Sequence, residues 1–137
     1  MTDTGRLLRK KSFDFALRIV RLSKYLENER KDLTLSKQIL RSGTSIGANI
    51  RESRFAQSTA DFVSKLCISL KESEETLYWL ELLKAADFID SEIFDSLKSE
   101  CDWLIGTLVN VVKAKKRELG INIKEPKQKV RLNNLTT

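Results

Sequence analysis

Apolar residues recur at steps of three and four along most of the chain, the spacing that places side chains on one face of an α-helix. The first such stretch predicts a helix from about Phe13 to Asn28, with the Ser12 hydroxyl as its N-cap. The side chains expected on its buried face are Ala16, Ile19, Val20, Ser23 and Leu26.

A second helix is predicted from about Leu35 to Ala56, with Thr34 as its N-cap. Gly43 and Gly47 fall inside this pattern, and each costs about 1 kcal/mol relative to alanine in a helix interior. Two explanations are open: a neighbouring helix approaches closely at the glycines, or the helix breaks near Gly43. The expected buried face comprises Leu35, Ile39, Ser42, Ile46, Asn49 and Ser53.

A third helix is predicted to begin after Gln57, where Ser58 to Asp61 resemble a capping box, and to end near Ala85. Its expected buried face comprises Phe62, Leu66, Ser69, Leu70, Ser73, Leu77, Leu80 and Leu83.

A fourth helix is predicted to begin after Asp90 or Ser91 and to end before Gly120, a residue suited to the left-handed stop after a helix. Its expected buried face comprises Phe94, Leu97, Cys101, Leu104, Leu108, Val111 and Val112.

Short connections between long helices favour antiparallel neighbours. The sequence therefore predicts an all-α protein, an antiparallel up-down-up-down four-helix bundle over residues 1–120. Composition agrees, because the 137 residues include one proline and five glycines, the residues that most often interrupt helices. Residues 121–137 are expected to form a basic, flexible C-terminal tail.

Antiparallel packing of the second and third helices predicts which of their residues face each other. Residues equidistant from the turn lie level, which pairs Ile46 with Ser69 and sets Arg41 beside Glu74 and Glu75. Arg41 and Glu75, or Glu74, are expected to form an ion pair between the helices. Three roles are open to it: a structural lock, a ligand-binding or catalytic pair, or a solvated pair worth under about 1 kcal/mol.

The residue inventory argues against an enzyme. The chain has no histidine, the commonest general base and metal ligand, and it lacks the glycine-rich phosphate-binding motifs. Cys67 and Cys101 have no CxxC spacing and are expected to be buried, reduced thiols. We expect no catalysis, no cofactor and no metal; an enzyme would need a carboxylate–arginine site such as Arg41, Glu72 and Glu75.

The sequence also argues against a membrane protein. No apolar run approaches the roughly 20 residues that span a bilayer, and residues 1–11 lack the apolar segment of a signal peptide. The protein is therefore expected to be cytoplasmic, without a membrane partner.

The net charge of +6 is unevenly distributed along the chain. An antiparallel bundle gathers the starts of the first and third helices and the ends of the second and fourth at one end. We call the ten basic residues expected there the basic pole: Arg6, Arg9, Lys10, Lys11, Arg51, Arg54, Lys113, Lys115, Lys116 and Arg117. Such a pole predicts sequence-independent contacts with the phosphates of RNA or DNA. The alternative is that these charges only solvate the surface and complement a helix dipole.

The opposite end of the bundle is expected to be acidic. Its acidic residues are Glu27, Glu29, Asp32, Glu81, Asp87, Asp90, Glu92 and Asp95. This acidic pole supports a second hypothesis, a protein-interaction scaffold without a nucleic-acid role.

Two segments carry a family resemblance. Residues 38–52, QILRSGTSIGANIRE, and residues 60–80, ADFVSKLCISLKESEETLYWL, resemble the bacterial four helix bundle protein family, also called the 23S rRNA intervening-sequence protein family. The resemblance extends over about residues 13–119. The family's characteristic residues here are Arg41, Ser42, Ser45, Asn49, Glu52, Glu72, Glu75, Thr76 and Trp79.

The resemblance implies a four-helix bundle that assembles as a homo-oligomeric ring, typically a pentamer. A related group resembles the accessory proteins of diversity-generating retroelements, which bind nucleic acid and a reverse transcriptase, so a partner of that kind is also implied. The residues alone are neutral on the ring. Tyr78, Trp79, Phe88 and Trp103 suit either a subunit interface or the bundle core.

Overall fold

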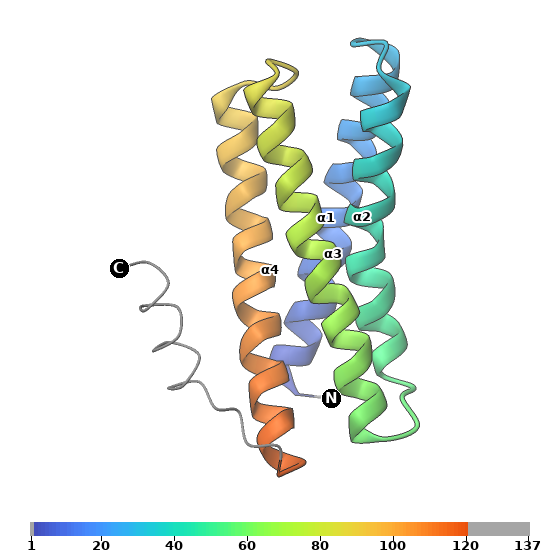
Figure 1. Ribbon diagram of the computed structural model, residues 1–137, viewed down its shortest axis with the longest axis vertical. Coiled ribbons are helices and arrows are strands. Elements are labelled where there is room, and N and C mark those ends of the chain that lie inside the picture. Colours follow the sequence, from blue (N-terminus) through green and yellow to red (C-terminus); the bar gives the residue numbers. More distant parts are fainter. Residues whose placement is uncertain (1, 121–137) are drawn as a thin grey trace, which may run out of the picture.

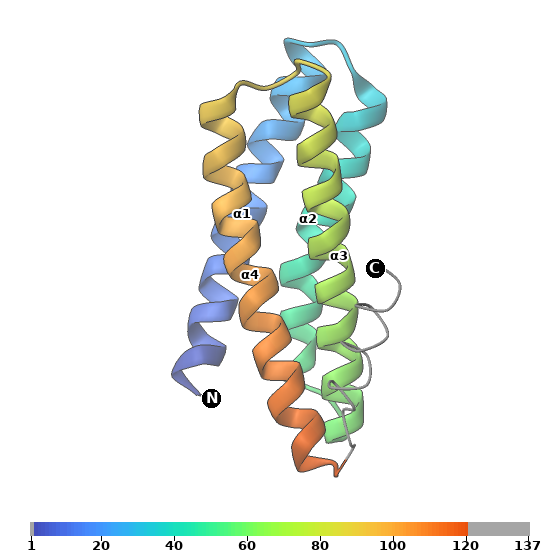
Figure 2. The ribbon, with the colours of Figure 1, turned by 60° about the vertical axis from the view of Figure 1, so that its left-hand side comes forward.

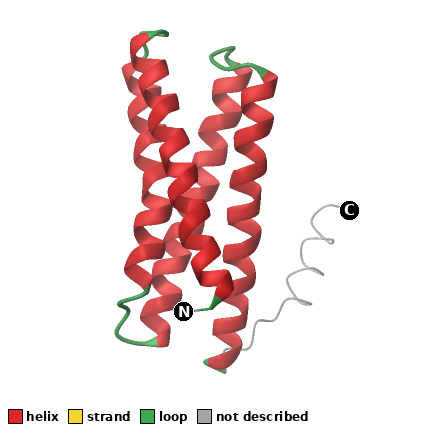
Figure 3. Ribbon diagram, turned by 180° about the vertical axis from the view of Figure 1, so that it is seen from behind, coloured by secondary structure: helices red, strands yellow, loops and turns green. Residues whose placement is uncertain are grey.

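The computed structural model describes residues 2–120, and four helices make up almost all of them (Figure 1). These are α1 (Asp3–Asn28), α2 (Leu33–Ser53), α3 (Thr59–Ala85) and α4 (Ser91–Glu118). Each helix packs against its neighbours in the sequence, and α1 also contacts α4. The loops that join these helices lie at the two ends of the bundle (Figure 3), so consecutive helices run antiparallel. The predicted all-α, up-down-up-down four-helix bundle is confirmed. The predicted tail, 121–137, lies outside the described residues.

The predicted start of α1 is wrong. Thr2 is the N-cap, because its hydroxyl accepts a hydrogen bond from the backbone nitrogen of Gly5 at 3.0 Å. Ser12 lies inside the helix, 1% exposed, and its hydroxyl donates to the carbonyl oxygen of Arg9 at 3.1 Å. A serine can bond back to its own helix as well as cap one, so its presence alone does not mark a start. The buried face also gains Leu8, Phe15 and Leu22, whereas Ala16 and Val20 are only half-buried.

The predicted cap and end of α2 are also wrong, by two and three residues. The Asp32 carboxylate, rather than Thr34, accepts the first-turn bond from the backbone nitrogen of Leu35 at 2.8 Å. The helix ends at Ser53 instead of Ala56. Both residue types are good N-caps, and sequence alone did not choose between them.

The ends of α3 and α4 follow the predicted signals. Ser58 caps α3 by accepting from the backbone nitrogen of Asp61 at 3.0 Å, and Asp90 caps α4. The Asp61 carboxylate accepts from the backbone nitrogen of Gln57 at 3.1 Å, one residue before the position of an ordinary capping box. Gly120 has a φ of 70°, as expected of a glycine that follows the C-cap.

The helix faces predicted to be buried form the core, but the buried face of α3 is rotated slightly about the helix axis from the predicted one. In α3, Val63 and Thr76 are buried, while Phe62, Leu70 and Leu77 are only half-buried against the core. Of the four aromatic residues with two possible roles, Trp79, Phe88 and Trp103 pack partly buried against the core, and Tyr78 is 57% exposed.

The glycines of α2 mark a close helix contact, and the helix continues unbroken through both. A Cβ added at Gly43 would lie 2.7 Å from Cγ2 of Ile19 on α1. One added at Gly47 would lie 3.3 Å from Oγ of Ser12. Because these glycines have no side chain, α1 approaches α2 closely, which confirms the first of the two explanations.

Buried hydroxyl groups link the helices at these close contacts. The hydroxyls of Ser23 in α1 and Ser36 in α2 lie 2.7 Å apart. The Ser69 hydroxyl in α3 donates to the carbonyl oxygen of Ile46 in α2 at 2.7 Å, so the predicted pairing of these two residues is confirmed. Small polar side chains that find partners in this way allow close packing without leaving buried groups unsatisfied.

Two residues in the loops have left-handed backbone conformations. Lys31 has a φ of 56° and Asp87 a φ of 63°. Asp87 stands in a Schellman motif, with the Phe88 nitrogen bonded to the Leu83 carbonyl oxygen at 2.8 Å. A lysine in this conformation is strained more than glycine would be.

We therefore expect Lys31→Gly to raise the free energy of unfolding by about 1 kcal/mol. The left-handed conformation costs a non-glycine residue roughly 1–2 kcal/mol, and the greater freedom of glycine in the unfolded state offsets part of the gain from removing this strain. Lys31→Ala removes the same charge but keeps the Cβ, and so serves as the control. Chemical denaturation measures both, and equal stabilities of the two variants would contradict the prediction.

Candidate nucleic-acid interface

The ten residues of the basic pole lie toward the end of the bundle that holds the N-terminus and the end of α4 (Figure 2). Four come from the first nine residues of α1, one from the last turn of α2, one from the residue that follows α2 and four from the last turns of α4. The α1–α2 and α3–α4 loops lie at the opposite end. The antiparallel order of the helices therefore produces the grouping expected from the sequence.

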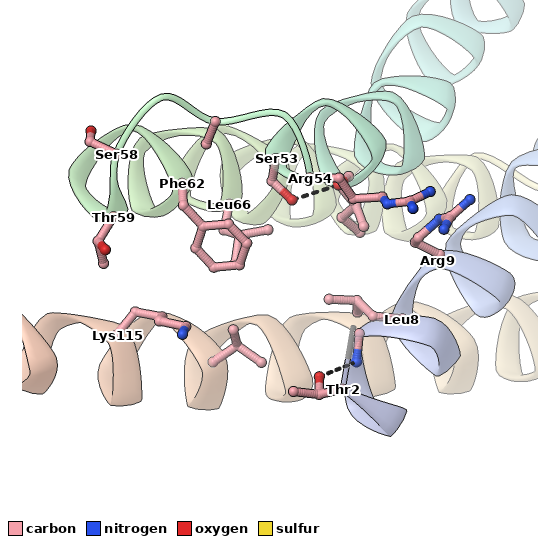
Figure 4. A pocket seen from close by; sticks show the side chains of 14 residues that line it. Thr2, Leu8, Arg9, Ser53, Arg54, Ser58, Thr59, Phe62, Leu66 and Lys115 are labelled. Atoms are coloured by element: carbon pink, nitrogen blue, oxygen red, sulfur yellow. Dashed lines mark hydrogen bonds between the residues drawn. The ribbon is translucent and has the colours of Figure 1, made fainter.

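Three arginines form the centre of the pole. Partial burial lowers the pKa of Arg9, and the positive charges of Arg54 and Arg51 lower it further, which places both of these groups within electrostatic reach of Arg9. The side chains of Arg9 and Arg54 lie side by side (Figure 4). Glu52, the neighbour of Arg51, pairs with Lys65 of α3 at 3.5 Å. An incoming anion would relieve the mutual repulsion of these arginines.

A cavity of about 580 Å³ opens beside this cluster, lined by residues of all four helices and the α2–α3 loop. We call it the pole cavity. Arg9 and Arg54 lie at one end of it and Lys115 of α4 at the other (Figure 4). None of its lining residues in the described range carries a carboxylate. Arg9 and Arg51 also line a second hollow of about 350 Å³ between α1 and α2.

Other members of the pole have close partners along their own helix. Arg6 pairs with Asp3 at 3.7 Å, Lys10 with Asp14 at 2.8 Å and Lys115 with Glu118 at 3.3 Å. These exposed pairs are weak, but each carboxylate offsets part of the local positive charge.

Lys11 is directed to a different surface, with its Nζ 5.3 Å from the ring centre of Trp103 on α4. Lys116 and Arg117 stand in the last turn of α4, where they complement the helix dipole. Within the described part of the pole, Arg9, Arg51 and Arg54 are therefore the basic residues whose charges act on one another across helices.

The predicted partner of Arg41 is only part of its environment. Its guanidinium group contacts the carboxylates of both Glu75 and Glu72, the latter at 3.2 Å. Glu75 also accepts a hydrogen bond from the indole nitrogen of Trp79 at 3.2 Å. Burial lowers the pKa of Arg41, but the charges and hydrogen bonds of Glu72 and Glu75 outweigh it and raise the pKa overall.

This network joins α2 to α3. Glu74 takes no part in this network, although the level of Arg41 in the antiparallel helix pair left Glu74 open as a partner. Glu72 was not predicted as a partner, although its spacing of three residues from Glu75 places both carboxylates on one helix face, within reach of one guanidinium group.

Several charges at the acidic pole have structural tasks. Asp32 and Asp90 cap helices, as described above. Arg30 donates to the carbonyl oxygens of Asp87 and Phe88, both at 3.0 Å, and its guanidinium carbon lies 4.7 Å from the Phe88 ring centre. Arg30 therefore ties the α1–α2 loop to the α3–α4 loop.

The two cysteines differ in their surroundings. Cys101 is buried, which raises the pKa of its thiol to about 12, and its Sγ donates to the Ser73 carbonyl oxygen at 3.3 Å. Cys67 is only half-buried, contrary to expectation. Across residues 2–120 no three acidic or cysteine side chains gather as a metal site. No helix within that range has the length and apolar character to cross a membrane.

Comparisons with known proteins agree with this fold. The model of the family described as 23S rRNA-intervening sequence protein matches residues 7–110. A crystal structure from Bacteroides thetaiotaomicron, described as a protein of unknown function from the S23 ribosomal protein family, is 50% identical to the chain. The match covers 80% of this chain and 98% of that one, with a TM-score of 0.79. A search of curated proteins gave no match. The chain belongs to the 23S rRNA-intervening sequence protein family.

Proposed function

We propose that the protein is a non-catalytic homo-oligomer that binds the phosphate backbone of RNA or DNA through its basic pole. The observation that carries this proposal is the grouping of Arg51 and Arg54 around Arg9, whose charge they repel, beside a cavity whose described lining has no carboxylate. Binding to phosphates would replace this repulsion by attraction and release counterions from the nucleic acid. The family's name, with its reference to 23S rRNA, supports RNA as one such ligand.

A different surface, on α3, would form the contacts between copies of the protein. Ile68, Tyr78 and Leu82 are exposed and share one face of α3. Covering such side chains with a second copy would bury apolar area and leave the basic pole accessible. In a ring, several poles would face one nucleic acid and raise its apparent affinity without new contacts.

A salt series tests the proposal. We expect a fluorescein-labelled RNA and a duplex DNA to bind at low salt, with the logarithm of the association constant falling linearly as the logarithm of salt rises. The slope is about −0.9 per phosphate contact for duplex DNA. Oligomer mass is measured on the same sample. An intact oligomer that binds neither probe at low salt would overturn the proposal and favour the protein scaffold, with a reverse transcriptase among the partners to test.

A further inference from the structure

The pole cavity has the dimensions of a small-ligand site. Its volume of about 580 Å³ lies within the range of about 300–1,000 Å³ that is usual for such sites. Thr2, Gly5, Val111 and Lys115 contribute to its lining and lie outside the residues that match the family model. The other ten lining residues lie within the matched range, so the matched segment forms most of the cavity and these four residues complete it.

The electrostatic character of the cavity favours an anion. Arg9, Arg54 and Lys115 line it, and no carboxylate is among the described lining residues, although Glu118 outside the lining offsets part of the charge of Lys115. The N-termini of α1 and α3 open onto it through Thr2 and Ser58. Both hydroxyls already cap their own helices, but the positive ends of the two helix dipoles still add to the field.

The remaining wall is apolar and includes an aromatic ring. Leu8, Ile50, Phe62, Leu66 and Val111 form it. Phe62 is half-buried and extends between α3 and α4 (Figure 4). The Nζ of Lys115 lies 5.7 Å from the centre of this ring. A simple phosphate ion would leave this wall uncovered, so the complementary ligand has a flat apolar part as well as an anionic part.

A second aromatic residue lies on the rim. Phe55, in the α2–α3 loop, is 79% exposed, and its ring centre is 5.7 Å from the guanidinium carbon of Arg54. Exposed aromatic rings interleaved with cations are typical of surfaces on which unpaired bases stack. A base inside a duplex cannot reach such a ring unless it leaves the stack, which costs a few kcal/mol.

We propose that the pole cavity holds one unstacked nucleotide, with its phosphate at Arg9 and Arg54 and its base against Phe62. Two sources supply this chemistry, a free nucleotide and the end of a single strand. The strand end rests on the proposed function, whereas the free nucleotide does not. Phe55 would stack the next base of a strand.

Binding of AMP, ribose 5-phosphate and adenosine to the full-length protein, measured by calorimetry, tests the proposal. We expect AMP to bind at least about 10-fold more tightly than either fragment, because only AMP fills both parts of the cavity. Arg54→Gln should weaken AMP binding about 10-fold, with Arg21→Gln, an exposed arginine elsewhere on α1, as its control. Phe62→Leu should remove the advantage of AMP over ribose 5-phosphate, with Tyr25→Leu as its control.

Binding of a 5′-phosphorylated oligoadenylate and of a blunt duplex of equal length distinguishes the two sources, a free nucleotide and the end of a single strand. If a strand end is the occupant, the single strand displaces AMP, and Phe62→Leu weakens the single strand but leaves the duplex unchanged. If a free nucleotide is the occupant, AMP binds as described and neither polymer responds to Phe62→Leu.

Two results would overturn the inference. One is AMP and ribose 5-phosphate binding equally in wild type, which would reduce the site to general attraction of phosphate. The other is no AMP binding at millimolar concentration, even where both polymers bind in a salt-dependent way. Circular dichroism shows whether the Phe62→Leu variant folds. If this variant does not fold, the inference is tested by the effect of Arg54→Gln on AMP binding and by the affinities of AMP and ribose 5-phosphate for the wild-type protein. Loss of polymer binding with AMP binding intact would instead refute the proposed function alone.

Discussion

Replacing both Arg51 and Arg54 with glutamate is expected to weaken binding of duplex DNA by more than about 100-fold at roughly 0.1 M salt. Each phosphate contact contributes about 0.9 to the slope against the logarithm of salt, so two lost contacts remove almost two powers of ten at this concentration. The new carboxylates add repulsion. The salt slope should become less steep by about 1.8. Both residues are exposed, so the bundle should still form.

The matched control reverses Lys24 and Lys37, which are exposed near the opposite end of α1 and α2. It gives the same change in net charge, from +6 to +2, since each variant loses four units. Fluorescence anisotropy with one labelled duplex compares the variants. If the control loses as much affinity as the Arg51 and Arg54 variant, net charge and not the pole governs binding, and the assignment of the site fails.

Gly43→Ala is expected to lower the free energy of unfolding by about 1–3 kcal/mol, although alanine favours a helix by about 1 kcal/mol over glycine. The added Cβ would lie 2.7 Å and 2.9 Å from two carbon atoms of Ile19. Ile19 is completely buried, so it cannot turn toward solvent to make room. Either α1 moves away from α2 or Ile19 adopts an unfavourable rotamer.

Gly106→Ala provides the control for this substitution. Gly106 lies in α4, and a Cβ there would have no atom within 4 Å. Only the helix preference remains, so this variant should gain about 1 kcal/mol. Urea denaturation of both variants measures the difference. Equal stabilisation of the two would contradict the close contact of α1 with α2.

The two ends of the bundle use their charges differently. At the acidic pole, Asp32 and Asp90 cap helices, and Arg30 joins the two loops. At the basic pole, Arg51 and Arg54 lie within electrostatic reach of Arg9, and Glu52, the neighbour of Arg51, pairs with Lys65. The acidic residues named here stabilise the fold, while the arginines raise the local potential. This contrast favours a polyanion at the basic pole over a basic protein at the acidic one.

The sequence by itself determined the number of helices, their antiparallel order and the ends of α3 and α4. These features depend on periodicity and on capping residues within a few positions of each other, so local physical chemistry decides them. The pairing of Ile46 with Ser69 followed from helix geometry and the position of one turn. The start of α1 did not follow, because Thr2 and Ser12 are both acceptable caps and burial of Ser12 against α2 distinguishes them.

Only the tertiary structure decided how the basic residues are grouped. The sequence placed ten of them at one end, but the rotation of each helix set Arg9 beside Arg54 and directed Lys11 to Trp103. The pole cavity and the position of Phe62 within it also depend on how four helix ends diverge. Successive side chains point about 100° apart around a helix axis, so a small rotation of a helix changes which of them face the cavity. The orientation of each helix about its axis is set by packing against all its neighbours rather than by its own sequence.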